Sequence, residues 1–208
     1  MSRWFDTESP VMTALAELLD WFLLSLLTLV CSAPLITLGP AWAALYKVME
    51  ERANGSSRPV LRNYFAQFRG LFRPALVNWL LFTAAGCFLS AEFRIVGNMP
   101  DGSRILFWAG TFLLTFCLIL TGIFLLPLLC THPTLPYKRL WKVAFIQGVA
   151  RLPRSLEILS ALLLPGIVFF FSPKCFWLLL PLWLFLWPAA TVRLWVRLTA
   201  PLFRNLPD

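Results

Sequence analysis

The sequence has few charged side chains, and this shortage excludes most soluble proteins. Only 13% of the 208 residues are Asp, Glu, Lys or Arg, whereas a soluble globular domain carries about a quarter. Histidine is rarer still: His132 is the only one, so the sequence offers no second histidine for a catalytic or metal-binding pair. These two shortages argue against a soluble enzyme and against a histidine-based metal centre.

Motifs of covalent and phosphate chemistry are also missing. The five cysteines lack the paired spacing of metal ligands, and they lie in or beside apolar runs, where cysteine acts as a small hydrophobic residue. There is no glycine-rich phosphate loop and no nucleophile elbow. We therefore expect no catalytic residues, no metal and no cofactor, and we predict that the protein is not an enzyme.

What the sequence has in abundance is long apolar runs. Hydrophobic residues make up 59% of it, and its mean hydropathy is +0.75. Such runs, separated by short polar segments, are typical of a membrane protein whose spans are α-helical, because a helix satisfies its own backbone hydrogen bonds in lipid. We predict one polytopic all-α membrane domain over residues 1–208, with about five transmembrane helices. The expected spans are approximately 12–38, 75–96, 105–131, 156–172 and 175–192.

Basic residues gather in the segments between these spans. Fourteen of the eighteen Lys and Arg lie in 40–73, 132–155 and 193–208. By the positive-inside rule, these are interfacial amphipathic or cytoplasmic segments, the N-terminus is outside and the C-terminus is inside. The net charge of +8 then suits anionic lipid headgroups. Nucleic acid is not expected, since no basic recognition helix is present. The N-terminus lacks the positive region of a secretory signal, so we expect the first run to be retained.

The segment 40–73 contains two predicted surface helices. The first begins at Pro40, carries Lys47 on its polar side and ends at Asn54-Gly55. The second has a stripe of arginines and, roughly a quarter-turn away, a stripe of phenylalanines. The stripes are Arg62, Arg69 and Arg73, and Phe65, Phe68 and Phe72. Two interpretations stay open: contact with lipid headgroups, or a docking surface for a partner protein.

Three polar residues interrupt the apolar runs. Glu17 and Asp20 are three residues apart and share one face of the first predicted span. They either lie at the outer membrane interface, or form an intramembrane acid pair that faces a polar cavity. Asn78 lies inside the second span, where its amide is expected to bond a neighbouring helix. We name Glu17, Asp20 and Asn78 as candidates for an intramembrane polar site.

The most distinctive residues begin at Pro34. Pro34-Leu35-Ile36-Thr37-Leu38-Gly39-Pro40-Ala41, with Ala44-Leu45-Tyr46 after it, resembles the YesL-like family of bacterial integral membrane proteins of unknown function. The resemblance continues in Tyr64-Phe65, Phe68-Arg69 and Phe72-Arg73. It implies a multi-pass protein of the bacterial cytoplasmic membrane and an accessory role beside carbohydrate uptake and sugar-sensing systems. The candidate motif or interface residues are Pro34, Thr37, Gly39, Pro40, Tyr46, Phe65, Phe68, Arg69, Phe72 and Arg73.

Two function hypotheses follow, with a structural lipid-binding scaffold as a third. The first is a non-enzymatic accessory or regulatory protein whose basic segments contact a transport or sensor protein. The second is a small-solute transporter or channel, in which helices broken by proline and the polar residues line a path.

Overall fold

The computed structural model describes residues 10–56, 58–97, 101–133 and 135–203, and all regular structure in these ranges is helical. The helices are α1 (Pro10–Ser32), η1 (a 3₁₀ turn, Leu35–Thr37), α2 (Leu38–Ala53), α3 (Val60–Gly97), α4 (Asp101–Thr131), α5 (Tyr137–Ala150), α6 (Leu152–Phe171), α7 (Pro173–Leu178), α8 (Leu180–Phe185) and α9 (Trp187–Phe203). The predicted all-α class is therefore confirmed.

Four helices of the described chain are long and apolar enough to cross a membrane. They contain the stretches Leu15–Ser32, Val60–Gly97, Arg104–Thr131 and Leu152–Phe171. The protein is thus a membrane protein with several candidate spans. The expected fifth span, 175–192, is not one helix, because the chain breaks at Leu179 and Leu186 into α7, α8 and α9. Pro181 and Pro188 follow these breaks and supply no backbone N–H to continue a helix.

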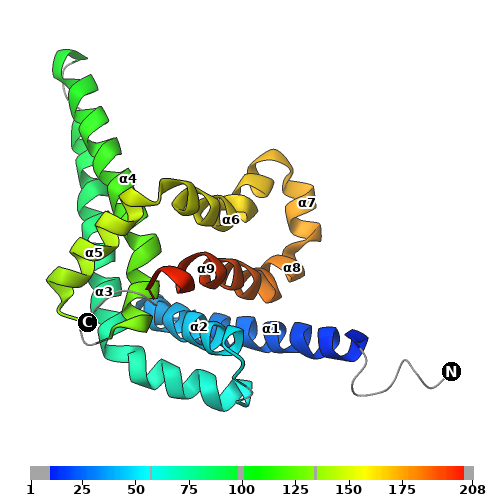
Figure 1. Ribbon diagram of the computed structural model, residues 1–208. Helices are drawn as coiled ribbons and strands as arrows, with labels where there is room; N and C mark the ends of the chain where they lie inside the picture. Colours follow the sequence, from blue (N-terminus) through cyan, green and yellow to red (C-terminus); the bar gives the residue numbers. More distant parts are fainter. Residues whose placement is uncertain (1–9, 57, 98–100, 134, 204–208) are drawn as a thin grey trace.

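The sequence predicted that a surface helix ends at Pro74 and that a separate span begins there. The structure instead has one helix that bends at this residue. α3 runs without interruption through Pro74. Figure 1 shows its first part crossing the base of the molecule beside α2, and its second part rising next to α4. Proline removes one helical hydrogen bond and its ring pushes away the carbonyl four residues earlier, which bends the axis.

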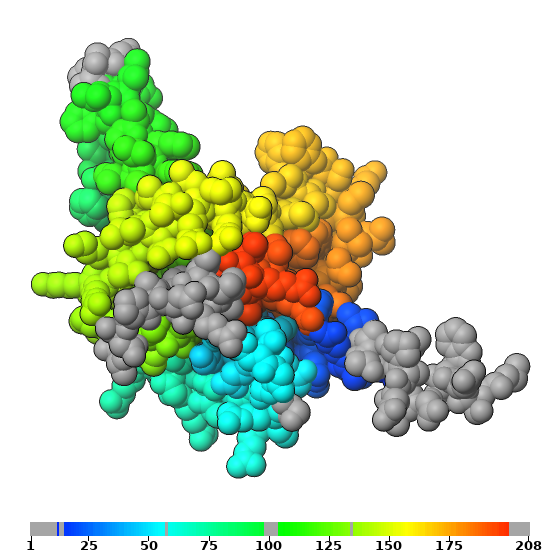
Figure 2. Space-filling model, in the orientation of Figure 1, coloured from blue at the N-terminus to red at the C-terminus, as the bar shows by residue number. Residues whose placement is uncertain are grey.

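The end of α3 and the beginning of α4 form an arm that stands clear of the other helices (Figure 2). Phe93 and Trp108 hold the two helices together through an edge-to-face contact, with ring centroids 5.4 Å apart. Outward-facing apolar side chains of the arm, such as Phe88, Ile105 and Phe112, are 67% to 79% exposed. An apolar surface of this kind suits lipid, not water.

The helix predicted from Pro40 is enclosed by other helices and does not lie on a surface. Ten of the sixteen residues of α2 are buried, among them Tyr46 and Glu50. α2 packs against α1, α3, α4 and α9. Small residues allow this close approach: Ala41, Ala43 and Ala44 are all fully buried. The surface position was expected because of the polar side of the helix, but these polar groups have partners inside the protein.

Gly39 is a position where α2 and α3 approach closely. A Cβ atom added there would press against Trp79 Cβ and lie 2.8 Å from Trp79 Cγ, and both atoms are close to the backbone of α3. Trp79 Cβ is fixed by the backbone of α3, so no side-chain rotation can move it away. The hydrogen atom of glycine is therefore a requirement of the packing at this point.

We predict that Gly39→Ala destabilises the protein by about 1–3 kcal/mol, the usual cost of overpacking. Gly70→Ala is the matched control, because a Cβ added in this exposed part of α3 meets nothing within 4 Å. Helix propensity alone favours alanine at both positions. The midpoint of thermal unfolding in detergent should fall for the first variant and not for the second. Equal midpoints would refute the close contact.

Candidate functional site

The turn after α1 is fastened by the hydroxyl of Thr37. The single proton of this hydroxyl is shared between two carbonyl oxygens, that of Cys31 at 2.6 Å and that of Pro34 at 2.8 Å. The Cys31 carbonyl belongs to the last turn of α1, where carbonyls lack helical partners. Trp79 adds a third bond, from its indole N–H to the Leu35 carbonyl at 3.0 Å. The first part of the predicted motif therefore forms the corner between α1 and α2.

Tyr46 connects α2 to the end of the described chain. Its side chain is fully buried, and its hydroxyl lies 2.7 Å from the Thr199 hydroxyl. Thr199 donates its only proton to the Trp195 carbonyl, so Tyr46 is the donor to Thr199. Burial raises the pKa of the Tyr46 phenol, more than the hydrogen bond with Thr199 lowers it. The phenol is thus held in the protonated form that donates.

Glu17 and Asp20 lie together in a polar hollow of about 370 Å³. Each carboxylate has its own arginine partner: Glu17 pairs with Arg193 of α9, and Asp20 with Arg52 at the end of α2. The guanidinium of Arg193 also lies over the Trp21 ring, 4.9 Å from its centroid. The acids therefore face a polar hollow, as one interpretation expected. They do not face each other as an acid pair, because each forms an ion pair with an arginine, and the two ion pairs join α1 to α2 and to α9.

These ion pairs restrict the membrane topology. A salt bridge requires both partners at the same depth. The outer position expected for Glu17 and Asp20 is therefore incompatible with the inner position expected for Arg52 and Arg193. The positive-inside count treats each segment separately, so it could not detect that α2 folds back along α1.

Asn78 lies in a different place from the two acids. It is 3% exposed, and its amide nitrogen donates to the Pro74 carbonyl at 2.9 Å. Its amide oxygen accepts from the indole N–H of Trp141 in α5 at 3.0 Å. The amide thus bonds a neighbouring helix, but Asn78 does not form one site with Glu17 and Asp20.

The first part of α3 has one buried and one exposed face. Tyr64 and Leu71 are buried, and Phe68 packs against the core and stacks on Tyr64 with ring centroids 6.3 Å apart. The exposed face carries Arg62, Phe65, Arg69 and Arg73. The arginine stripe is therefore exposed. Of the three phenylalanines, Phe65 is exposed, whereas Phe68 and Phe72 are half-buried.

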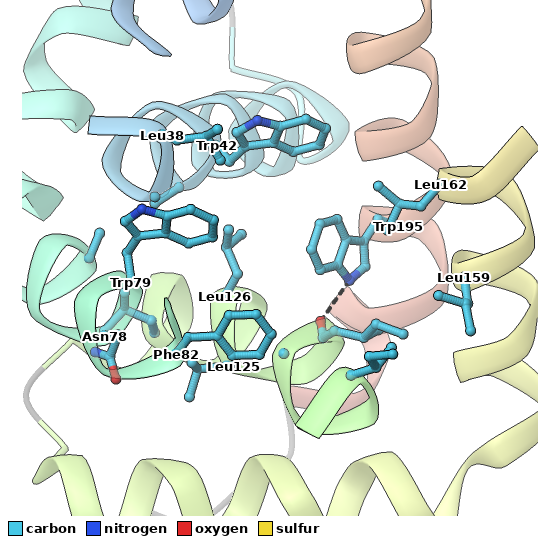
Figure 3. A pocket seen from close by; sticks show the side chains of 17 residues that line it. Leu38, Trp42, Asn78, Trp79, Phe82, Leu125, Leu126, Leu159, Leu162 and Trp195 are labelled. Atoms are coloured by element: carbon cyan, nitrogen blue, oxygen red, sulfur yellow. Dashed lines mark hydrogen bonds between the residues drawn. The ribbon is translucent and has the colours of Figure 1, made fainter. Parts of the chain in front are cut away.

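An apolar pocket of about 440 Å³ lies on another side of α2, among α3, α4, α6 and α9. Figure 3 shows the rings of Trp79, Phe82 and Trp195 around its interior, with Leu159 and Leu162 of α6 on one side. None of the arginines described above lines this pocket.

Sequence reasoning missed the partners supplied by distant segments: Trp141, Arg193, Trp195 and Thr199. A cationic partner such as Arg193 could have been predicted, because a buried or half-buried acid in an apolar run requires a cation. The role of Thr199 could not have been predicted, since nothing in the sequence relates it to Tyr46. Among the described residues, no three His, Cys, Asp or Glu side chains group as metal ligands. The expected lack of metal, cofactor and catalysis stays a prediction.

The fold and these contacts define an all-helical, multi-pass type of membrane protein. Residues 18–93 match the family described as "Protein of unknown function, DUF624", which confirms the YesL-like resemblance over these residues. The match includes α2, the corner at Thr37 and the exposed face of α3. No curated protein and no solved structure matches the chain.

We predict that the Tyr46–Thr199 bond is worth about 1 kcal/mol of coupling energy. Thr199→Val should cost more than Tyr46→Phe, because it leaves the buried phenol without an acceptor. The double variant should be less destabilised than the sum of the two single variants. Thermal unfolding of the four proteins in one detergent measures the cycle. Additive effects would mean that the two hydroxyls do not interact.

We predict that Glu17→Arg places two cations side by side and loosens α1 from α9. Exchanging both charges, as Glu17→Arg with Arg193→Glu, should restore most of the loss. Hydrogen exchange of the α1 amides reports this attachment. A charge-exchanged protein as unprotected as the single variant would show that the ion pair does not hold α1.

Proposed function

We propose that the protein is a non-enzymatic accessory or regulatory component of the bacterial cytoplasmic membrane. It acts by docking a membrane transport or sensor protein on the exposed face of α3. The observation that carries the proposal is the separation of faces between Val60 and Pro74: one face is buried against α2, and the other presents Arg62, Phe65, Arg69 and Arg73. Arginine and aromatic residues are enriched at protein interfaces.

A hollow beside this face strengthens the proposal. It is lined by Phe68, Arg69, Gly70, Phe72, Arg73 and Pro74, at the bend of α3. A concave surface with two guanidinium groups at its edge fits an acidic and apolar segment of a partner. Anionic lipid headgroups are the second binding partner of the same arginines, because they require positive charge but no particular shape.

The polar side chains of the interior support a non-catalytic role. The amide of Asn78, the hydroxyls of Tyr46 and Thr199, and the carboxylate of Asp20 all make bonds within the protein. Groups held in this way fasten helices together and offer little to a reacting molecule. The association with carbohydrate uptake or sensing rests on the family resemblance.

For the topology, we infer that the exposed face of α3 and the basic residues of α5 are cytoplasmic, as the positive-inside rule predicts. The tip of the α3–α4 arm then lies outside. Since Asp20 contacts Arg52 and Glu17 contacts Arg193, the beginning of α1 lies on the same side as these arginines. We propose this side in place of the expected outer position of that end of α1.

A small-solute transporter is the second candidate, and the polar hollow at Glu17 and Asp20 is the observation in its favour. A proteoliposome assay with sugars and small ions tests it. We predict that Glu17→Gln combined with Asp20→Asn leaves any flux of correctly folded protein unchanged, because both carboxylates are already paired with arginines and are not free to bind a solute. Loss of flux in this variant would favour transport over the accessory role.

We predict that Arg62→Glu with Arg69→Glu abolishes co-purification of a transport or sensor subunit from native membranes in mild detergent. Replacing both arginines by lysine should also weaken it by roughly tenfold, because lysine lacks the planar donor fork of arginine. Binding to anionic vesicles should survive the lysine change and fail only with glutamate. Lys174→Glu is the control, since Lys174 is exposed and lies in α7. Equal recovery from all four proteins would contradict docking on α3.

A further inference from the structure

The apolar pocket between α2, α3, α4, α6 and α9 has no role in the proposed function. Its volume, about 440 Å³, lies within the range of sites that bind small molecules, roughly 300–1,000 Å³. Packing normally leaves few voids larger than a water molecule. A space of this size among apolar side chains therefore requires an explanation.

Three of the four polar side chains that line the pocket, those of Asn78, Trp79 and Trp195, are already bonded to the protein. The indole N–H of Trp79 donates to the Leu35 carbonyl, and that of Trp195 to the Ile123 carbonyl, each at 3.0 Å. Both ends of the Asn78 amide are bonded as well. A polar guest would lose its water and gain few hydrogen bonds in return. The pocket thus selects a guest made of hydrocarbon.

The walls of the pocket cannot collapse to fill it. Trp79 packs directly on Gly39, and the ring of Phe82 packs on Gly122, where an added Cβ would lie 2.6 Å from Phe82 Cε2. Trp195 is held by its hydrogen bond and by an edge-to-face contact with Tyr46. Because these rings are fixed by backbone and by each other, the space between them persists.

The pocket opens at apolar side chains of candidate membrane spans. Phe82, Leu126, Leu159 and Leu162 belong to α3, α4 and α6 and are only half-buried, and Ile119 is 36% exposed. A lipid tail can therefore enter from the surrounding hydrocarbon without crossing a polar layer. Its flexible chain can follow the space between the rings in Figure 3.

We propose that this pocket binds the hydrocarbon chain of a lipid. The chain belongs either to a membrane phospholipid or to a free fatty acid, which present the same chemistry to the pocket. Binding adds buried apolar surface to α2, α3, α4 and α6 at once, and so stabilises their arrangement.

The test uses the full-length protein in phosphatidylcholine vesicles with a photoactivatable diazirine in one acyl chain. A second arm uses diazirine-labelled palmitic acid. We expect cross-links that saturate with probe concentration and lie in the peptides 75–82 and 119–129. Leu162→Trp and Leu126→Trp should each lower the saturable signal by about tenfold, because the indole displaces buried methylenes of the guest. Leu163→Trp is the matched control, since Leu163 is 52% exposed and does not line the pocket.

Labelling by either probe at these peptides supports the proposal, and the responding arm identifies the source of the chain. Cross-links that spread over the exposed arm as strongly as over the pocket would overturn it. Unchanged labelling in both pocket variants would overturn it too. Size-exclusion chromatography and thermal unfolding identify a misfolded variant, and the other pocket variant then decides.

Discussion

The structure depends on satisfying the polar groups of a helix that is enclosed by other helices. α2 carries Tyr46, Lys47, Glu50, Glu51 and Arg52 in its second half, and burying such groups without partners would cost several kcal/mol. Each has a bond within the protein. Lys47 pairs with Glu50 at 2.9 Å, Glu51 accepts from Asn63 and Gln67, Arg52 pairs with Asp20, and Tyr46 reaches Thr199. Except for the Lys47–Glu50 pair within α2, the partners come from α1, α3 and α9, so these bonds tie those three helices to α2.

The first half of α2 is held by packing and not by polar bonds. Gly39, Ala41, Ala43 and Ala44 are small and buried in the half of α2 that packs against α3 and α4. Backbone approach of this kind is the usual means of close helix contact in membranes. The family match over residues 18–93 therefore includes the small residues that allow close packing of α2. It also includes most of the residues that form polar bonds with α2.

The sequence was sufficient for elements whose cause is local. Apolar length predicted α1, α3, α4 and α6, because a hydrocarbon environment requires continuous helices. It failed where the cause is distant. Lys47 and Arg52 indicate a surface helix, because the sequence does not show that Arg52 pairs with Asp20 of α1. Likewise, the sequence around Tyr46 does not reveal its partner Thr199, which lies 153 residues further along the chain. The candidate site shows the same difference between local and distant causes. The exposed arginine stripe of α3 could be predicted from helical periodicity, whereas the apolar pocket forms only when five helices come together.

α2 is also the wall shared by the apolar pocket and the polar hollow. Leu38, Gly39 and Trp42 line the apolar pocket, and Met49 and Arg52 line the polar hollow. Alternating access would need this wall to move against its neighbours. It is fixed near its beginning by Gly39 against Trp79, in its middle by Tyr46 and Thr199, and at its end by Arg52 and Asp20. A wall fastened at three levels to three helices favours a rigid scaffold that presents the face of α3 to a partner, over a carrier that changes shape in each cycle.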